Sequence, residues 1–294
     1  MGLFFSSDRF TRPGPGVRPD APRKKGVARL AEIMGRDMWN FFRAGFLAFL
    51  GCLPFIIGMF FAVETHALLF MLLAGIIGGL IAGPELSAMA DTVLRSLRDE
   101  PGYWWETYRR VWKRNARESL VPGMLTGLVL SMQIFTLFHM SVISAGIVTW
   151  VLLILSFVVT LGLESYIWPQ IALLDLPLYG ILKNSLLLFL GYLPRSLGAI
   201  AIKAVYWGAI LLFFPLTTII LPFTNFWLPM LPALLCVYQP LNKCFTIEST
   251  INKMREDDLN AALAKDNEPL PEDSTEKAEE STEASSDDSS SDVQ

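Results

Sequence analysis

The sequence predicts an all-α membrane protein: a polytopic bundle of about six transmembrane helices with two cytoplasmic amphipathic interfacial helices. Hydrophobic residues make up 52% of the 294 residues and charged residues only 18%, whereas a soluble domain carries about a quarter charged residues. Long uncharged stretches recur along the chain, and Lys and Arg collect in alternate connecting segments. Uncharged stretches of about 20 residues are typical of membrane-spanning helices.

Six stretches are long and apolar enough to cross a bilayer. They are residues 41–62, 67–90, 120–138, 142–164, 196–221 and 226–246. A seventh apolar segment, residues 178–194, is shorter and has Lys183 and Asn184 near its middle. Because a short helix with a central charge spans a bilayer poorly, we expect this segment to lie along the membrane surface.

The distribution of positive charge predicts how the spans are oriented. Nine Lys or Arg fall within residues 9–43 and seven within residues 95–117. The turns near 63–66, 139–141 and 222–225 contain none. Cytoplasmic loops of membrane proteins are enriched in Lys and Arg. We therefore predict that the N-terminus and the C-terminus are both cytoplasmic.

Composition divides the chain into three parts. Residues 1–37 are basic and rich in Pro and Gly, residues 38–254 contain the six spans, and residues 255–294 are acidic. From Glu256 onward there are fourteen acidic residues and two Lys, so the formal net charge of −4 hides a basic membrane domain. The basic N-terminal part is expected near the anionic inner leaflet of the bilayer. Residues 268–294 have almost no apolar side chains and are expected to be disordered.

The segment PGYWWETYRRVWKRNARESL, residues 101–120, combines aromatic and basic side chains. At about 100° per residue, a helix over residues 103–117 separates them onto two faces. One face has Trp104, Trp105, Tyr108, Val111 and Trp112, and the other has Arg109, Arg110, Lys113, Arg114 and Arg117. Asp99 and Glu100 precede Pro101, an arrangement that suits the start of this helix.

Three interpretations of this helix are open. A helix with Trp and Tyr on one face and Lys and Arg on the other typically lies in the headgroup region, and two spans flank this one. A basic face is also suited to docking a partner protein. Nucleic-acid binding requires aromatic and basic side chains on one accessible surface, whereas here they lie on opposite faces. We therefore predict an interfacial or packing helix that also offers a docking face, and no nucleic-acid partner.

Four ionisable residues in or beside the spans are candidate functional residues, since charges within a membrane are rare and costly. They are Glu85, Asp91, Glu164 and Lys203. Because Pro84 lacks a backbone donor, we expect the second span to break or kink there and to place Glu85 in the first turn of the following helix segment. In one hypothesis Glu85 and Glu164 face a cation across the bundle interior, either Lys203 or Arg43. In the other, the four residues only cap helix ends or reach toward the interface.

Motifs for enzymatic chemistry are absent from the sequence. There is no HExxH, GxSxG, Walker A or GxGxxG motif, which excludes an ATPase subunit. The cysteines Cys52, Cys236 and Cys244 have no zinc-ligand spacing. The two histidines, His66 and His139, are too few for most metal or catalytic sites. We therefore predict that the protein is not an enzyme, with no catalytic residue, cofactor or metal site.

Three stretches of the chain carry a family resemblance. They are FFSSDRFTRPGPGVRPDAPRKKG at residues 4–26, GPELSAMADTVLRSLRDEPGYWWETYRRVWKRNARESL at 83–120, and LLDLPLYGILKNSLLLFLGYLPRSLGA at 173–199. In order and spacing they resemble the YesL-like family of bacterial integral membrane proteins, a domain family of unknown function. The resemblance covers about residues 4–250. Family members commonly have a small residue after the Gly-Pro pair, where this chain has Glu85, so no role for Glu85 follows from the family.

The resemblance implies a multi-pass protein of the bacterial plasma membrane. Genes of this family often lie beside carbohydrate ABC transporters, which implies a non-enzymatic accessory role in carbohydrate uptake. Such a protein would act on transporter subunits through its cytoplasmic basic face. Two alternatives are open: a small secondary transporter or channel that uses Glu85 and Lys203, and a membrane scaffold that recruits partners through the acidic tail.

Overall fold

The computed structural model describes residues 23–100, 102–142 and 146–266. These residues form helices and no strand, which confirms the predicted all-α class. Residues 267–294, which contain most of the predicted acidic tail 255–294, and most of the basic N-terminal part lie outside the described residues. The chain divides into two units at residues 244 and 245, which we describe separately.

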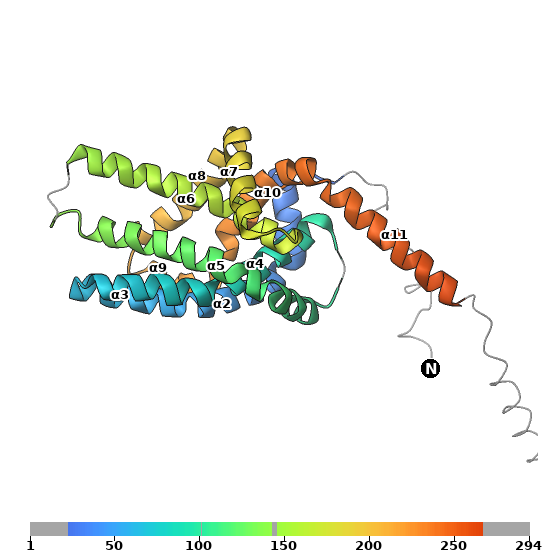
Figure 1. Cartoon of the computed structure of the whole chain (residues 1–294), viewed down its shortest axis with the longest axis horizontal. Coiled ribbons are helices and arrows are strands. Elements are labelled where there is room, and N and C mark those ends of the chain that lie inside the picture. The colour runs from blue at the N-terminus through green and yellow to red at the C-terminus, as the bar shows by residue number, and fades with distance from the viewer. Residues whose placement is uncertain (1–22, 101, 143–145, 267–294) are drawn as a thin grey trace, which may run out of the picture. The chain divides into compact units, whose positions relative to one another are not determined.

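Eleven helical elements make up the described residues. The first half contains α2 (Val27–Thr65), α3 (Leu68–Leu73), the π-helical segment η1 (Ala74–Gly78), α4 (Gly79–Arg98), α5 (Trp104–Phe138) and α6 (Ile147–Leu173). The second half contains α7 (Leu178–Gly191), α8 (Leu193–Leu212), α9 (Thr217–Thr224), α10 (Trp227–Phe245) and α11 (Ile247–Asp266). Within the first unit α4 packs against α2 and α5, and α6 packs against α5 and α8 (Figure 1).

Five elements of the described chain are long and apolar enough to cross a membrane. They are Val27–Thr65, Leu68–Arg98, Trp104–Phe138, Ile147–Leu173 and Leu193–Leu212, and each overlaps one of the first five predicted spans. The region predicted as the sixth span forms α10, which is not among these five. It contains Pro232 and Pro240, and the polar residues Gln239, Asn242 and Lys243 lie toward its C-terminal end. The shorter apolar segment forms α7, whose 14 residues span about 21 Å, less than the hydrocarbon core of a bilayer.

The basic and aromatic segment is not a separate helix. Residues 103–117 were expected to form one, but α5 begins at Trp104 and continues through Pro122 to Phe138. No Gly or Pro occurs between Trp104 and Val121, so nothing interrupts the helical hydrogen bonds there. With 35 residues, α5 is about 52 Å long and exceeds the thickness of the hydrocarbon core.

The second span also differs from its prediction. It was expected to break or kink at Pro84, but α4 continues without a break through Pro84 from Gly79 to Arg98. The irregular part lies earlier, in η1. A proline removes only one backbone hydrogen bond, and packing of neighbouring helices stabilises such a helix within a membrane. Glu85 therefore lies inside a continuous helix and not at an N-terminus.

Glycines bring the backbones of two spans into contact. Gly75, Gly79 and Gly83 recur every four residues along η1 and α4, and they face Gly123 and Gly127 of α5. A Cβ atom added to Gly127 would lie 2.5 Å from the carbonyl oxygen of Gly75 and 2.8 Å from the Cα of Gly79. Such small residues at every fourth position allow membrane helices to pack closely. This contact fixes the position of α5, and with it the side chains described below.

Candidate functional site

Charged side chains gather where α4 ends and α5 begins, which we call the charged end. Asp99 is the residue that follows α4, and its backbone is left-handed with φ of 59°. Its carboxylate accepts hydrogen bonds from Arg29, at 2.7 Å, and from Arg36. Arg23 makes a third ion pair with it at 3.1 Å. Three arginines from the start of the described chain therefore converge on one carboxylate.

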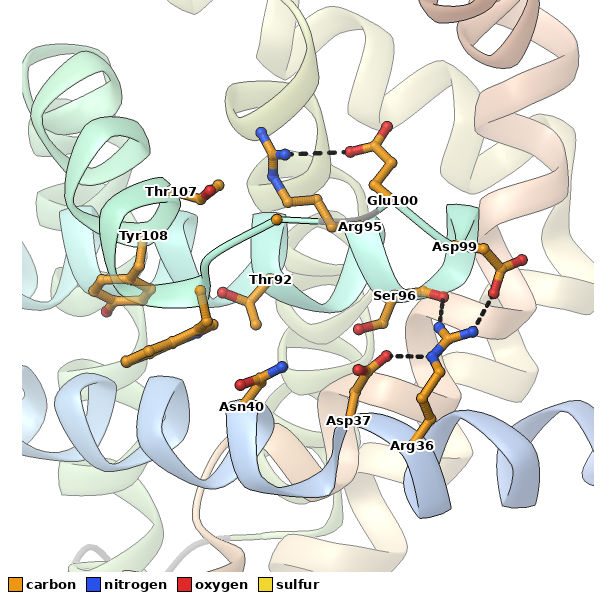
Figure 2. A pocket seen from close by; sticks show the side chains of 12 residues that line it. Arg36, Asp37, Asn40, Thr92, Arg95, Ser96, Asp99, Glu100, Thr107 and Tyr108 are labelled. Carbon is orange, nitrogen blue, oxygen red and sulfur yellow. Dashed lines mark hydrogen bonds and ion pairs between the residues drawn. The ribbon is translucent and has the colours of Figure 1, made fainter. Parts of the chain in front are cut away.

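The same arginines cap the C-terminus of α4. Arg36 Nη2 donates to the carbonyl oxygen of Ser96 at 2.8 Å, as Figure 2 shows, and Arg29 Nη2 donates to that of Leu97 at 3.1 Å. The last carbonyl groups of a helix lack partners within the helix, and cations stabilise that end through the helix dipole. Part of the N-terminal basic cluster is thus used in binding the end of α4.

The arginines also decide the ionisation of Asp99. Burial by itself would raise the pKa of the Asp99 carboxyl, because a carboxylate is less well solvated there. Hydrogen bonds from Arg36 and Arg29, together with their positive charges, outweigh burial and hold the pKa of Asp99 below its ordinary value. Asp99 is therefore a charged anchor between α2 and the end of α4.

Asp99 and Glu100 were expected to stabilise the start of α5, but their side chains interact with the end of α4. Glu100 accepts two hydrogen bonds from Arg98, at 2.7 and 3.1 Å, and lies 3.4 Å from Arg95. Arg95 in turn donates to Asp91 at 2.7 Å. Asp91 was a candidate functional residue, and the structure places it in this buried ion-pair network, where it holds the last two turns of α4 together.

A cavity of about 290 Å³ opens at the charged end, between α2, α4 and the start of α5 (Figure 2). Its lining residues are Arg36, Asp37, Asn40, Thr92, Arg95, Ser96, Asp99, Glu100, Gly102, Trp104, Thr107 and Tyr108. Both arginines in this lining are already paired with carboxylates. An anionic ligand would have to displace those carboxylates, so the lining is better suited to a neutral or cationic polar molecule. The volume is at the lower limit for small-molecule sites.

Glu85 is bound by α5. Tyr108 Oη donates to Glu85 Oε2 at 2.5 Å, and Trp112 Nε1 donates to Glu85 Oε1 at 3.0 Å. On its other side Glu85 contacts α2, where a Cβ atom added to Gly51 would lie 2.6 Å from Glu85 Cγ. Arg43, which was considered as a partner for Glu85, instead stacks over the ring of Trp104, with its guanidinium carbon 5.6 Å from the ring centroid.

Glu164 and Lys203 lie near each other, on α6 and α8 of the first unit. Lys203 is only 8% exposed, and its ammonium group donates to the carbonyl oxygen of Leu161 at 3.4 Å. Glu164 of α6 is near enough for its charge to interact with that of Lys203, but within the described residues the two side chains form no ion pair. Lys203 therefore lies near Glu164, while Glu85 has the two α5 donors Tyr108 and Trp112.

The predicted aromatic face of α5 is divided between packing and exposure. Tyr108 and Val111 are buried, whereas Trp105 is 56% and Trp112 36% exposed. Asn115 continues the buried stripe, and its amide donates to Ser87 of α4 at 3.1 Å. Sequence reasoning missed Asn115 as a packing residue, although its spacing of four residues from Val111 was a signal for it.

The predicted basic face of α5 is exposed. Arg109, Lys113 and Arg117 lie at every fourth residue, and we call these three the basic stripe. Within the described residues the stripe makes no ion pair, whereas the neighbouring Arg110 pairs with Glu106 at 3.1 Å. Arg114 donates to the carbonyl oxygen of Ala172 at 2.8 Å, which links α5 to α6. The stripe is thus an exposed row of three cations on a helix anchored along its opposite side.

No family model, curated protein or solved structure matches this chain. The resemblance to the YesL-like family therefore stays a prediction.

Proposed function

We propose that this protein is a non-enzymatic accessory protein of the bacterial plasma membrane that is linked to carbohydrate uptake. In this proposal the charged end faces the cytoplasm, and the basic stripe binds an acidic surface on a subunit of a carbohydrate ABC transporter. The basic stripe is the observation that carries the proposal. Its three cations are exposed, evenly spaced and free of ion pairs within the described residues. A partner can therefore bind them without breaking an ion pair of the described residues.

The rigidity of α5 supports this role. Hydrogen bonds from Tyr108 and Trp112 to Glu85, and from Asn115 to Ser87, bind the buried side of the helix to α4. A preorganised charged surface loses little conformational freedom when a partner binds. Complementary charge also raises the association rate and selects among partners.

The test is recovery of the partner from native membranes. A photo-crosslinking residue at position 109 of otherwise unchanged protein should capture a transporter subunit. Combined Arg109→Glu, Lys113→Glu and Arg117→Glu changes should reduce recovery about tenfold or more, because attraction is replaced by repulsion. The matched control changes three other exposed cations by the same total charge: Arg110→Glu, Lys183→Glu and Arg195→Glu.

Equal recovery from the stripe variant and the control variant would contradict the proposed contact surface. Recovery of no transporter subunit from unchanged protein would contradict the link to carbohydrate uptake. Both variants should elute as the unchanged protein does in size-exclusion chromatography, since all six side chains are exposed.

A second candidate function is a small secondary transporter or channel that uses Glu85 and Lys203. One observation favours it: Tyr108 lines the cavity and also donates to Glu85, so a polar connection leads from the charged end toward the bundle interior. Proton movement into proteoliposomes, followed with an enclosed pH-sensitive dye, tests this candidate. Transport that is abolished by Glu85→Gln would support it, and a rate equal to that of empty liposomes would contradict it. The membrane scaffold that acts through the acidic tail stays a further alternative.

A further inference from the structure

The two histidines of this chain meet although 72 residues separate them in the sequence. His66 follows α2 and His139 follows α5, at the end of the bundle opposite the charged end. His66 Nδ1 lies 2.7 Å from His139 Nε2, and the ring planes are at 83° to each other. The tertiary structure therefore brings every imidazole of the chain to one place.

The hydrogen bonds around the two histidines determine which ring nitrogens carry protons. His139 Nδ1 lies 2.8 Å from the carbonyl oxygen of Phe135. A carbonyl oxygen only accepts hydrogen bonds, so Nδ1 carries the proton and the Nε2 of the neutral ring has a free lone pair. His66 Nδ1–H then donates to that lone pair. Histidines that bind metals are commonly fixed in this way, with the second nitrogen donating to a backbone carbonyl.

Packing holds the His139 ring in place, whereas the His66 side chain is exposed. The His139 side chain is buried and stacks on Phe135, with ring centroids 4.0 Å apart. Phe135 in turn packs against a buried cluster of Met59, Ala62, Met71 and Ala74. His66 has a left-handed backbone, with φ of 53°, a conformation that costs free energy in a residue other than glycine.

The local charge is compatible with a bound cation. Glu64 is the only charged residue between Arg43 and Glu85, and residues 119–163 contain none. No cation is therefore nearby in the sequence of α2, α3, η1 or the second half of α5. Within the described residues no third His, Cys, Asp or Glu completes a three-ligand group. The protein would supply two ligands, and water would supply the others.

We propose that His66 Nδ1 and His139 Nε2 bind a divalent transition-metal cation of the zinc class, which joins the α2–α3 turn to the end of α5. Zinc bonds of about 2.0–2.1 Å at a tetrahedral angle separate two nitrogens by about 3.3 Å. The rings would therefore have to move apart by about 0.6 Å and turn so that both lone pairs point at the metal. His66 would transfer its proton from Nδ1 to Nε2 as the metal enters. Imidazole pairs suit zinc, copper and nickel, whereas magnesium and calcium prefer oxygen ligands.

Zinc-dependent thermal stability of the detergent-solubilised protein tests this site. The protein should carry no polyhistidine tag, and a Cys244→Ser background removes an exposed thiol that could bind zinc. Free zinc at about a hundredfold excess over the dissociation constant should raise Tm by about 5 °C, because a ligand that binds only the folded state stabilises it. EDTA should reverse the shift. His66→Gln and His139→Gln should each abolish it, and Glu64→Gln should retain it.

Two results would overturn the proposal: a Tm unaffected by zinc up to about 1 mM, or a zinc-induced shift of full size in both histidine variants. X-ray absorption at the zinc edge gives a second measurement on protein with both histidines intact. The expected signal is two imidazole ligands with oxygen and no sulfur. Sulfur ligation, or fewer than two imidazoles, contradicts the site even if the histidine variants do not fold.

Discussion

Tyr108 of α5 and Glu85 of α4 are joined by a hydrogen bond of 2.5 Å between the phenol and the carboxylate. The bond connects the cavity lining to the interior of the second span, and Trp112 donates to the other carboxylate oxygen. Hydrogen bonds to charged groups contribute about 1.5–3 kcal/mol each. Glu85 therefore acts as an anchor that holds the start of α5 to α4.

Replacement of Glu85 tests this anchor. Glu85→Gln retains one acceptor but presents an amide donor to the other aromatic donor, and we expect unfolding to become easier by about 1–3 kcal/mol. Tyr108→Phe should cost less, because Trp112 keeps its acceptor. In a double-mutant cycle measured by denaturant unfolding in detergent, Glu85→Gln and Tyr108→Phe should be non-additive. Additive effects would show that the two side chains do not interact.

The glycine contact between α4 and α5 predicts strong sensitivity to added volume. Gly79→Leu should destabilise the protein by several kcal/mol or prevent folding, because its side chain would occupy the position of the Gly123 carbonyl group. Gly208→Ala is the matched control, since a Cβ atom at that helical glycine meets no atom within 4 Å. The control should be neutral or stabilising by about 0.5–1 kcal/mol. Tm measured by light scattering separates the two outcomes.

The ion pairs of Asp99 with Arg29 and Arg36 should stabilise the folded protein to an extent that depends on pH. The folded protein lowers the pKa of Asp99, so its contribution is present above the unfolded pKa of about 3.9 and is lost as pH falls through the lower folded value. Asp99→Asn should therefore lower Tm at pH 7, and the difference from the unchanged protein should shrink as the pH falls below about 4. The effect should be modest, about 1 kcal/mol or less, because Asp99 is partly exposed to solvent.

Glu106→Gln provides the control for Asp99. Glu106 pairs with Arg110 on the exposed side of α5, where both side chains are more than two-thirds exposed. Such surface pairs contribute little, so Tm should change little at any pH. If the Tm of the Asp99→Asn variant depends on pH in the same way as the Tm of the unchanged protein, the role of Asp99 as a charged anchor is contradicted.

Lys203 should couple to Glu164 and not to Glu85. Lys203 lies near enough to Glu164 for their charges to interact, whereas Glu85 has aromatic partners from α5. Combining Lys203→Gln with Glu164→Gln should cost less than the sum of the single changes, because each single change leaves a buried charge without its partner. Lys203→Gln with Glu85→Gln should be close to additive. Denaturant unfolding of the four single and double variants measures both couplings.

Cysteine labelling tests the orientation. Cys244 is exposed, and Cys52→Ser with Cys236→Ser leaves it as the single thiol. The predicted orientation places Cys244 in the cytoplasm, so a membrane-impermeant maleimide should label it in inverted vesicles and not in intact cells. Ser141→Cys, in the exposed turn after α5, should show the opposite pattern in a chain without the native cysteines. Labelling of both positions from the same side would contradict the orientation.

Local features of the sequence predicted much of the fold. Runs of apolar residues located the elements that are long and apolar enough to cross a membrane, and the length of residues 178–194 predicted a short helix, α7. The continuity of α5 was not predicted, because the charge pattern changes near residue 120. No Gly or Pro between Trp104 and Val121 interrupts the helix there. The glycines at every fourth residue were visible in the sequence, but their spacing does not say which helix they face.

The sequence by itself determined that the chain is all-α, strongly apolar and basic before its acidic tail, because composition and periodicity are local properties. Only the tertiary structure decided which polar groups meet. It gave Glu85 the partners Tyr108 and Trp112, brought Arg29 and Arg36 to Asp99, and placed His66 beside His139. These contacts join residues from separate helices. The periodicity of one helix does not specify where a second helix crosses it or how that second helix is rotated about its axis.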